Sequence, residues 1–181
     1  MLGWFYFLKA FSTNIFKSIN RKESITFLNN HHHFYHQQKL ALDIVKLCDQ
    51  ENIYKNRYES NEKFCIWNEP LLVVCDGTIT EVVSDLRDNT AYSETDIKNP
   101  KGNHIVLQCK SGISILYAHM KMGSSYLQVN DVILSGSQIG NVGNSGNTTE
   151  PHLHIQANLN KEPLLLIFNG QSYMRNDLMK I

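Results

Sequence analysis

The chain reads GNSGNTTEPHLHI from Gly143 to Ile155, and this stretch delivers His152 and His154 with one residue between them. Successive side chains of a β-strand point to opposite faces, so these two histidines would project from the same face. Neutral imidazole is the commonest protein metal ligand and titrates near neutral pH, so the pair suits metal-assisted proton chemistry. An isolated His-x-His is more often two polar residues on the wet face of a strand. A functional site at His152 and His154 therefore requires partner residues elsewhere in the chain.

Short apolar segments separated by turn residues surround this stretch. Strands are predicted at residues 71–75, 78–83, 103–109, 114–120, 128–133 and 138–142, and an edge strand at 164–170. Asp76-Gly77 is a turn signal between the first two strands, and residues 110–112 supply a second hairpin turn. Because no helical pattern separates the strands, we expect a mainly β fold, an antiparallel sandwich or barrel rather than a parallel βαβ sheet.

Two polar segments interrupt these strands. Residues 48–68 carry tyrosines and are interpreted as a loop or lid, and residues 84–102 form a nineteen-residue loop. Loops of this length are usually functional or mobile. We expect a β domain over residues 30–170, an N-terminal extension over 1–29 and a C-terminal tail over 171–181.

Composition excludes several functional classes. Seventeen basic and seventeen acidic residues cancel to a formal charge of zero, so no net field recruits nucleic acid or anionic lipid. Residues 2–16 are apolar and aromatic-rich, but Lys9 interrupts them and no small-residue cleavage site follows. They predict a short N-terminal helix or a weak anchor and no clear transmembrane segment, and oligomeric state stays open.

The four cysteines lack the close-pair spacing of a zinc ribbon. Cys75 and Cys109 each fall in a strand-like run and could face each other, in which case a disulfide would indicate an oxidising compartment. Reduced, buried thiols fit the sequence equally well.

A carboxylate stands in the apolar segment Leu40–Leu47. A strand there places Asp43 on one face with Ala41 and Val45. A charged group in such surroundings costs free energy unless it is paired. Asp43 is therefore either a buried carboxylate with a structural partner or a metal ligand.

A hydrolytic zinc site needs three protein ligands and one open position. Asp43 and His154 can supply two of them, and a histidine from the cluster at residues 31–36 the third. His152 and His119 are then available as proton acceptor and oxyanion partner. The alternatives are an ordinary strand histidine at 119 and a solvated loop at 31–36. His104, at a strand start, is more typical of a structural residue.

Taken together, these segments resemble the lysostaphin-like zinc metallopeptidases. The likeness runs over residues 30–167 and lies in their order along the chain: the carboxylate strand, GNHIV from Gly102, YAHM from Tyr117, VNDV from Val129 with SGSQIG from Ser135, GNSGN from Gly143, and PHLH from Pro151. The resemblance implies an antiparallel β-sheet groove, one Zn²⁺ per chain and peptidoglycan endopeptidase activity.

The resemblance also implies roles for individual residues. His154 resembles the family's zinc ligand in the final pair, and His152 its catalytic histidine. His119 resembles the second catalytic histidine, and Asp43 the carboxylate ligand.

The first metal ligand departs from the common pattern. That pattern places a histidine four residues before the aspartate, where this chain has Lys39. A branch of the family takes the ligand from further upstream, after an asparagine, and Asn30-His31-His32 fits that form. We favour His32, with His36 and His31 as alternatives.

The expected function is hydrolysis of peptide bonds, foremost in bacterial peptidoglycan, at the cell envelope or outside the cell. The alternative is a non-catalytic relative that binds cell wall or regulates a partner hydrolase.

Overall fold

The computed structural model describes residues 24–27, 38–49, 51–168 and 170–180. The predicted N-terminal helix and the histidine cluster at 31–36, with the predicted ligand His32, lie outside the described residues. Within the part that is described, no helix has the length and apolarity needed to cross a membrane.

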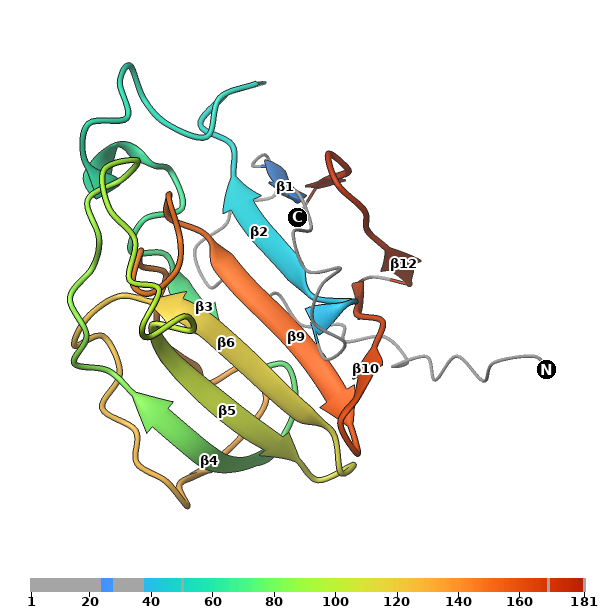
Figure 1. Cartoon of the computed structure of the whole chain (residues 1–181). Helices are drawn as coiled ribbons and strands as arrows, with labels where there is room; N and C mark the ends of the chain where they lie inside the picture. The colour runs from blue at the N-terminus through green and yellow to red at the C-terminus, as the bar shows by residue number, and fades with distance from the viewer. Residues whose placement is uncertain (1–23, 28–37, 50, 169, 181) are drawn as a thin grey trace.

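Strands account for nearly all the regular structure (Figure 1). They are β1 (Ser24–Phe27), β2 (Leu42–Lys46), β3 (Pro70–Leu72), β4 (Gly77–Val83), β5 (Asn103–Cys109), β6 (Ser114–Met120), β7 (Val132–Ile133), β8 (Gln138–Asn141), β9 (Leu153–Leu159), β10 (Glu162–Leu164), β11 (Ile167–Phe168), β12 (Gln171–Ser172) and β13 (Leu178–Lys180). A short 3-10 turn, η3 (Asn61–Lys63), follows β2. The predicted mainly β fold is confirmed.

One large sheet contains most of these strands, in the order β13-β1-β2-β9-β6-β5-β4-β7, with β10 on β9. Every pairing in it is antiparallel. Figure 1 shows β9 running between β2 and β6 through the middle of the sheet. β1 and β13 lie outside residues 30–170, so the sheet also uses residues assigned above to the extension and the tail.

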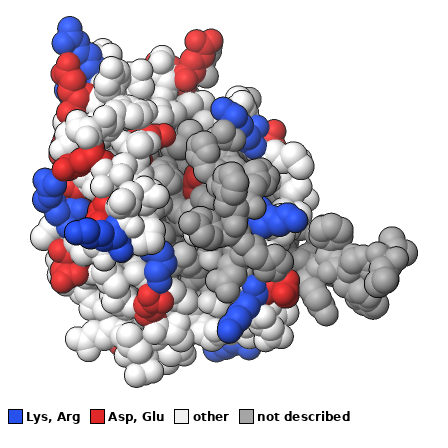
Figure 2. All heavy atoms as spheres, viewed as in Figure 1, with Lys and Arg blue, Asp and Glu red and all other residues white. Residues whose placement is uncertain are grey.

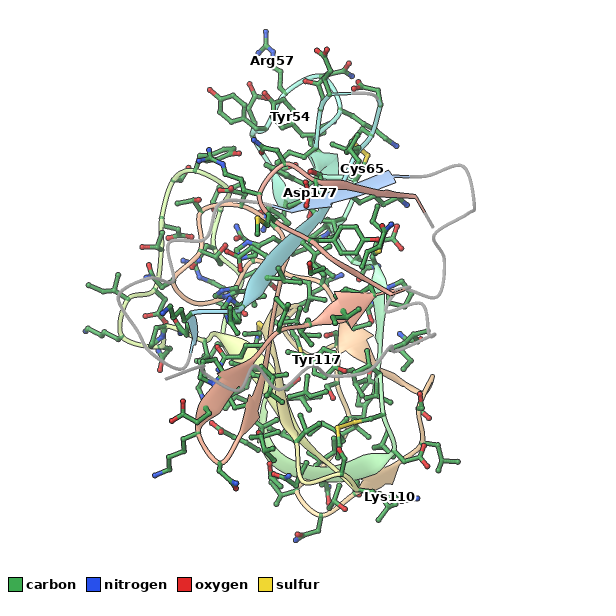
Figure 3. All side chains as sticks on the ribbon, turned by 90° about the vertical axis from the view of Figure 1, so that its right-hand side faces the viewer. Tyr54, Arg57, Cys65, Lys110, Tyr117 and Asp177 are labelled. Carbon is green, nitrogen blue, oxygen red and sulfur yellow. A yellow bond between two sulfur atoms is a disulfide. The ribbon has the colours of Figure 1, made fainter. Side chains whose placement is uncertain are left out.

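The hydrophobic core lies on one face of this sheet. Leu153 and Ile155 of β9 are fully buried and share that face with Tyr117 of β6, which is paired with Ile155. The small β3–β8 sheet and its flanking residues close the core, and the backbone N–H of Val74 donates to the Tyr117 hydroxyl at 3.1 Å. Figure 3 shows Tyr117 in the middle of the molecule, with Lys110 and Tyr54 toward opposite ends.

Two details of the predicted strands are wrong. Residues 71–83 do not form a hairpin, because β3 pairs with β8 while β4 pairs with β5 and β7. Gly77 serves a close approach instead, since a Cβ there would overlap the backbone oxygen of Gln108 on β5. Residues 164–170 are not one edge strand either, because β10 ends at Leu164 and β11 pairs with β12.

The cysteines form two disulfides, Cys48–Cys65 and Cys75–Cys109. The second is the pair that the strand positions allowed. The first closes the segment that follows β2. Because both pairs are bonded, the alternative of reduced thiols does not hold.

Candidate active site

The register between β2 and β9 places Asp43 directly opposite His154. Residues opposite each other in an antiparallel pair share a face, and here it is the face away from Leu153 and Ile155. The Asp43 Oδ1 and His154 Nδ1 atoms are 2.9 Å apart, and both residues are buried. Because a buried carboxylate is costly without a partner, the pairing accounts for the carboxylate in an otherwise apolar strand.

His152 precedes β9 and joins this pair. Its Nε2 atom lies 3.6 Å from Asp43 Oδ1. Its Nδ1 atom lies 2.9 Å from the backbone oxygen of Glu150 and 3.2 Å from the Thr148 hydroxyl. A carbonyl oxygen only accepts hydrogen bonds, so Nδ1 carries the ring hydrogen. The other ring nitrogen, Nε2, therefore faces the Asp43 and His154 pair.

His119 reaches the same place through an unusual backbone conformation. Ala118 is paired with His154 and shares its face, so strand alternation would turn residue 119 toward the core with Tyr117. The φ angle of His119 is +61°, a left-handed value that is uncommon outside glycine. The β5–β6 register also shifts between Asn103 and Ile105. The ring consequently lies 4.8 Å from that of His152, centroid to centroid.

Hydrogen bonds fix the orientation of His119. Its Nδ1 lies 2.8 Å from the backbone oxygen of Ser145, so that nitrogen carries the hydrogen and Nε2 is unprotonated in the neutral ring. Burial, and then the neighbouring His152 and His154, lower the pKa of His119 well below its ordinary value. His119 is therefore neutral at pH 7, with an unprotonated Nε2 that can accept a hydrogen bond.

The glycine-rich stretch packs closely against the start of β5. Gly102 has a φ of +58°, and a Cβ there would overlap the backbone oxygen of Ser145. The Ser145 hydroxyl accepts from the Asn103 N–H at 2.8 Å and donates to the Met120 oxygen at 2.7 Å. The Ser145 side chain thus holds Met120, the residue after His119, and the Ser145 carbonyl holds the His119 ring.

The 84–102 loop lies against the same stretch, at the end of the sheet where β6 stops and β9 starts (Figure 1). Asn89 donates from its side-chain nitrogen to the backbone oxygens of Gly146 and Thr148 at 2.7 and 3.1 Å. The Tyr92 N–H donates to the backbone oxygen of Thr149 at 2.7 Å. The loop therefore borders the site.

Aromatic rings connect this loop to the segment closed by the Cys48–Cys65 disulfide. Tyr58 contacts Tyr92 edge-on with ring centroids 5.1 Å apart, and Tyr54 contacts both Tyr58 and Phe64. Tyr58 and Tyr92 are about half exposed. The two long segments predicted to be loops thus pack together beside the histidines.

The donor atoms at this site suit a zinc ion. Imidazole nitrogen and carboxylate oxygen are both zinc ligands, and His154 and Asp43 direct one of each toward the other from neighbouring strands. Among the described residues, no group of three His, Cys, Asp or Glu side chains is arranged to hold a metal ion. Asp43 and His154 are two members of the predicted ligand set, which stays a prediction, and the third member, His32, is outside the described residues.

His104 has a different environment from the other described histidines. Its ring nitrogens lie 2.6 Å from the Gly102 oxygen and 2.7 Å from Glu81 Oε1, and Lys101 also binds Glu81. These contacts anchor the Gly102 turn, which agrees with the structural role expected for His104. Asp43, His119, His152 and His154 are the predicted residues that the structure brings together.

Sequence reasoning missed the groups that orient the histidines. Ser145 and Thr148 belong to the quoted stretch, but the sequence offers no signal for their contacts with His119 and His152. Two of the acceptors are backbone carbonyls, of Glu150 and Ser145, which any residue type would supply.

Comparisons with known proteins agree with this architecture. Residues 67–165, more than half of the chain, match the family model described as Peptidase family M23. The DD-carboxypeptidase/endopeptidase Mpg of Neisseria meningitidis serogroup B is 36% identical over 67 residues, which are 37% of this chain and 15% of that protein. The chain thus matches only a small part of the length of this curated relative.

Two solved structures share the fold. The deep-sea M23 metalloprotease pseudoalterin superposes with a TM-score of 0.53 at 14% identity, covering 89% of this chain and 80% of that chain. The catalytic domain of the prophage-encoded M23 protein EnpA from Enterococcus faecalis, as a point mutant, superposes with a TM-score of 0.50 at 15% identity, covering 83% and 94%.

Proposed function

The chain belongs to peptidase family M23, and from this premise we propose that it is a zinc-dependent endopeptidase acting on peptide bonds of bacterial peptidoglycan. The observation that carries the proposal is the meeting of Asp43 and His154, 2.9 Å apart, beside two further histidines whose rings are held by backbone carbonyls. This arrangement combines a donor pair suited to a metal with two further imidazoles whose Nδ1 hydrogens are already engaged.

Asp43 and His154 would hold the zinc ion, together with a histidine of the 31–36 cluster, for which His32 is our choice and His31 and His36 are the alternatives. Bound zinc supplies a Lewis acid that polarises the scissile carbonyl and acidifies water. The burial of both described ligands keeps competing water away from them.

The two remaining histidines would manage protons. His152 accepts a proton from the attacking water at Nε2, because its Nδ1 hydrogen is engaged by Glu150, and it returns that proton to the leaving amine. His119 accepts a hydrogen bond from the water at Nε2 and orients it. The same nitrogen then accepts from the hydroxyl group that the water leaves on the tetrahedral intermediate, so His119 stabilises the intermediate while staying neutral.

Substrate class and location rest on less direct support. The relative Mpg is named as a carboxypeptidase and endopeptidase, which favours a peptide substrate here. On the face shown in Figure 2, basic and acidic side chains are interspersed, which favours recognition by shape and hydrogen bonds over attraction of a polyanion. The two disulfides support an oxidising location, at the cell envelope or outside the cell.

The test is zinc content and turnover of purified cross-linked muropeptides, measured on the same preparations. His154→Ala should lose both, whereas His152→Ala should keep most of the zinc and lose the rate. Glu59→Ala, which removes an exposed carboxylate, is the control and should keep both. Full hydrolysis by metal-free protein would refute zinc dependence. Stoichiometric zinc without turnover would favour the binding or regulatory relative instead.

The third ligand is located by zinc quantification on single alanine variants of His31, His32, His33 and His36. We expect the loss at His32 alone. Unchanged zinc in all four variants would exclude the cluster.

A further inference from the structure

Gln156 occupies a position on β9 that bears directly on His154. It follows His154 by two residues on the same strand and therefore shares its face. Its side chain is buried, with 8% of the residue exposed, and its Oε1 atom lies 3.2 Å from His154 Nε2. The His154 ring thus has Gln156 at one nitrogen and Asp43 at the other.

We propose that Gln156 is a positioning residue for His154: its amide oxygen accepts the Nε2 hydrogen and leaves Nδ1 as the metal-binding nitrogen. This inference deepens the proposed function and rests on it. A neutral imidazole carries one ring hydrogen, so the partner of one nitrogen decides which nitrogen can bind a metal. The Asp43 carboxylate only accepts hydrogen bonds, so its 2.9 Å contact in the metal-free chain uses a hydrogen on Nδ1. When zinc binds, that hydrogen is released and Gln156 keeps the one on Nε2, which leaves the Nδ1 lone pair for the metal.

The local environment strengthens this contact. Gln156 is opposite Leu116 of β6 in the sheet, and Leu116 is itself buried. In such low-dielectric surroundings a hydrogen bond is electrostatically stronger than in water. An amide buried without partners would cost about 1–3 kcal/mol. The contact with His154 gives the Gln156 amide oxygen a partner at 3.2 Å.

Asn158 provides a matched control. It is the next residue on the same face of β9 and also carries an amide. Gln156→Leu and Asn158→Leu each replace an amide by leucine on one face of the strand, and only the first removes a contact to His154.

The experiment measures zinc affinity by competition with a chromophoric chelator. Loss of a partner that orients a ligating histidine typically weakens metal binding 10–100-fold. We expect a loss of about that size in Gln156→Leu and no more than about twofold in Asn158→Leu. Gln156→Glu keeps an oxygen acceptor and should bind zinc at least as tightly as the parent chain.

Cobalt substitution and ¹⁵N NMR give readouts that a purely structural role would not move. The visible absorption of the Co²⁺ form should change in Gln156→Leu and not in Asn158→Leu. In the zinc-loaded parent protein, labelled His154 should carry hydrogen on Nε2. This last measurement needs no variant, so misfolding of Gln156→Leu would not remove the test.

Three results would overturn the inference. They are equal zinc affinity in Gln156→Leu and the parent chain, a loss in Gln156→Glu as large as that in Gln156→Leu, and an unprotonated Nε2 in the zinc form. A parent chain that binds no zinc at all would overturn the proposed function together with the inference. A parent chain that binds zinc regardless of residue 156 would overturn the inference alone.

Discussion

Replacing Ser145 by alanine tests how the glycine-rich stretch supports the site. Ser145 is fully buried, and its hydroxyl is a hydrogen-bond acceptor for the N–H of Asn103, which is also fully buried. Without the hydroxyl that N–H loses its partner, at a cost of about 1–3 kcal/mol. The hydroxyl also donates to the Met120 oxygen, which keeps a hydrogen bond from the Asn103 side chain at 3.2 Å. Losing the hydroxyl there therefore adds little to the free-energy cost of the substitution. We expect a loss near 2 kcal/mol, or about 4–8 °C in Tm for a chain of this size.

The assay is urea unfolding with both disulfides intact, which gives the change in free energy from the shift in midpoint at constant slope. Ser111→Ala, in the exposed turn between β5 and β6, is the control and should stay within about 0.5 kcal/mol of the parent chain. The His119 ring is held by the Ser145 carbonyl, which the substitution retains. Hydrolysis should therefore fall less in Ser145→Ala than in His119→Ala. A Ser145→Ala chain as stable as Ser111→Ala would refute the assignment of the Asn103 N–H to this hydroxyl.

Three further substitutions probe the surrounding structure. Tyr117→Phe removes the acceptor of a buried backbone N–H and should cost about 1–3 kcal/mol in urea unfolding; a change below about 0.5 kcal/mol would contradict the contact. Hydrogen bonds from His104 and Lys101 lower the pKa of Glu81 from its ordinary 4.5, so its stabilisation is present above that pKa and is lost as pH falls through the folded value. The destabilisation of Glu81→Gln should accordingly shrink between pH 7 and pH 3, and a constant difference would argue against it. Gly102→Ala combines a left-handed φ with a backbone overlap, so it should destabilise by more than about 1 kcal/mol and reduce turnover, whereas unchanged thermal unfolding would show that the turn relaxes.

Local pattern predicted most of the sheet. Alternating apolar residues located β5 and β6, and the turn between them set their pairing. The same reasoning wrongly joined β3 to β4, because the partner of β3 is β8, far along the chain. Local pattern carries no information on such long-range pairing, so Asp76-Gly77 was interpreted as a hairpin turn although Gly77 is needed for close approach to β5.

The residues of the candidate site could be predicted from the sequence, but the backbone conformation that brings His119 to it could not. Residue types and strand positions singled out Asp43, His119, His152 and His154, which the structure brings together. The roles that the family resemblance implies for them and for His32 stay predictions. Strand alternation would have turned His119 into the core, and only the left-handed backbone at this residue brings it beside His152. Nothing in the residue types around position 119 indicates that conformation.

The pairing of β2 with β9 also has a kinetic consequence. Asp43 and His154 are 111 residues apart in the chain, and they meet only when these two strands pair in register. Contacts between distant parts of a chain form slowly, because the entropy of closing a long loop is lost before the contacts compensate for it. The donor pair is therefore absent from a chain whose C-terminal strands have not yet been synthesised or paired. If the proposed zinc site is correct, peptide hydrolysis by a refolding chain should begin only after β2 and β9 have paired.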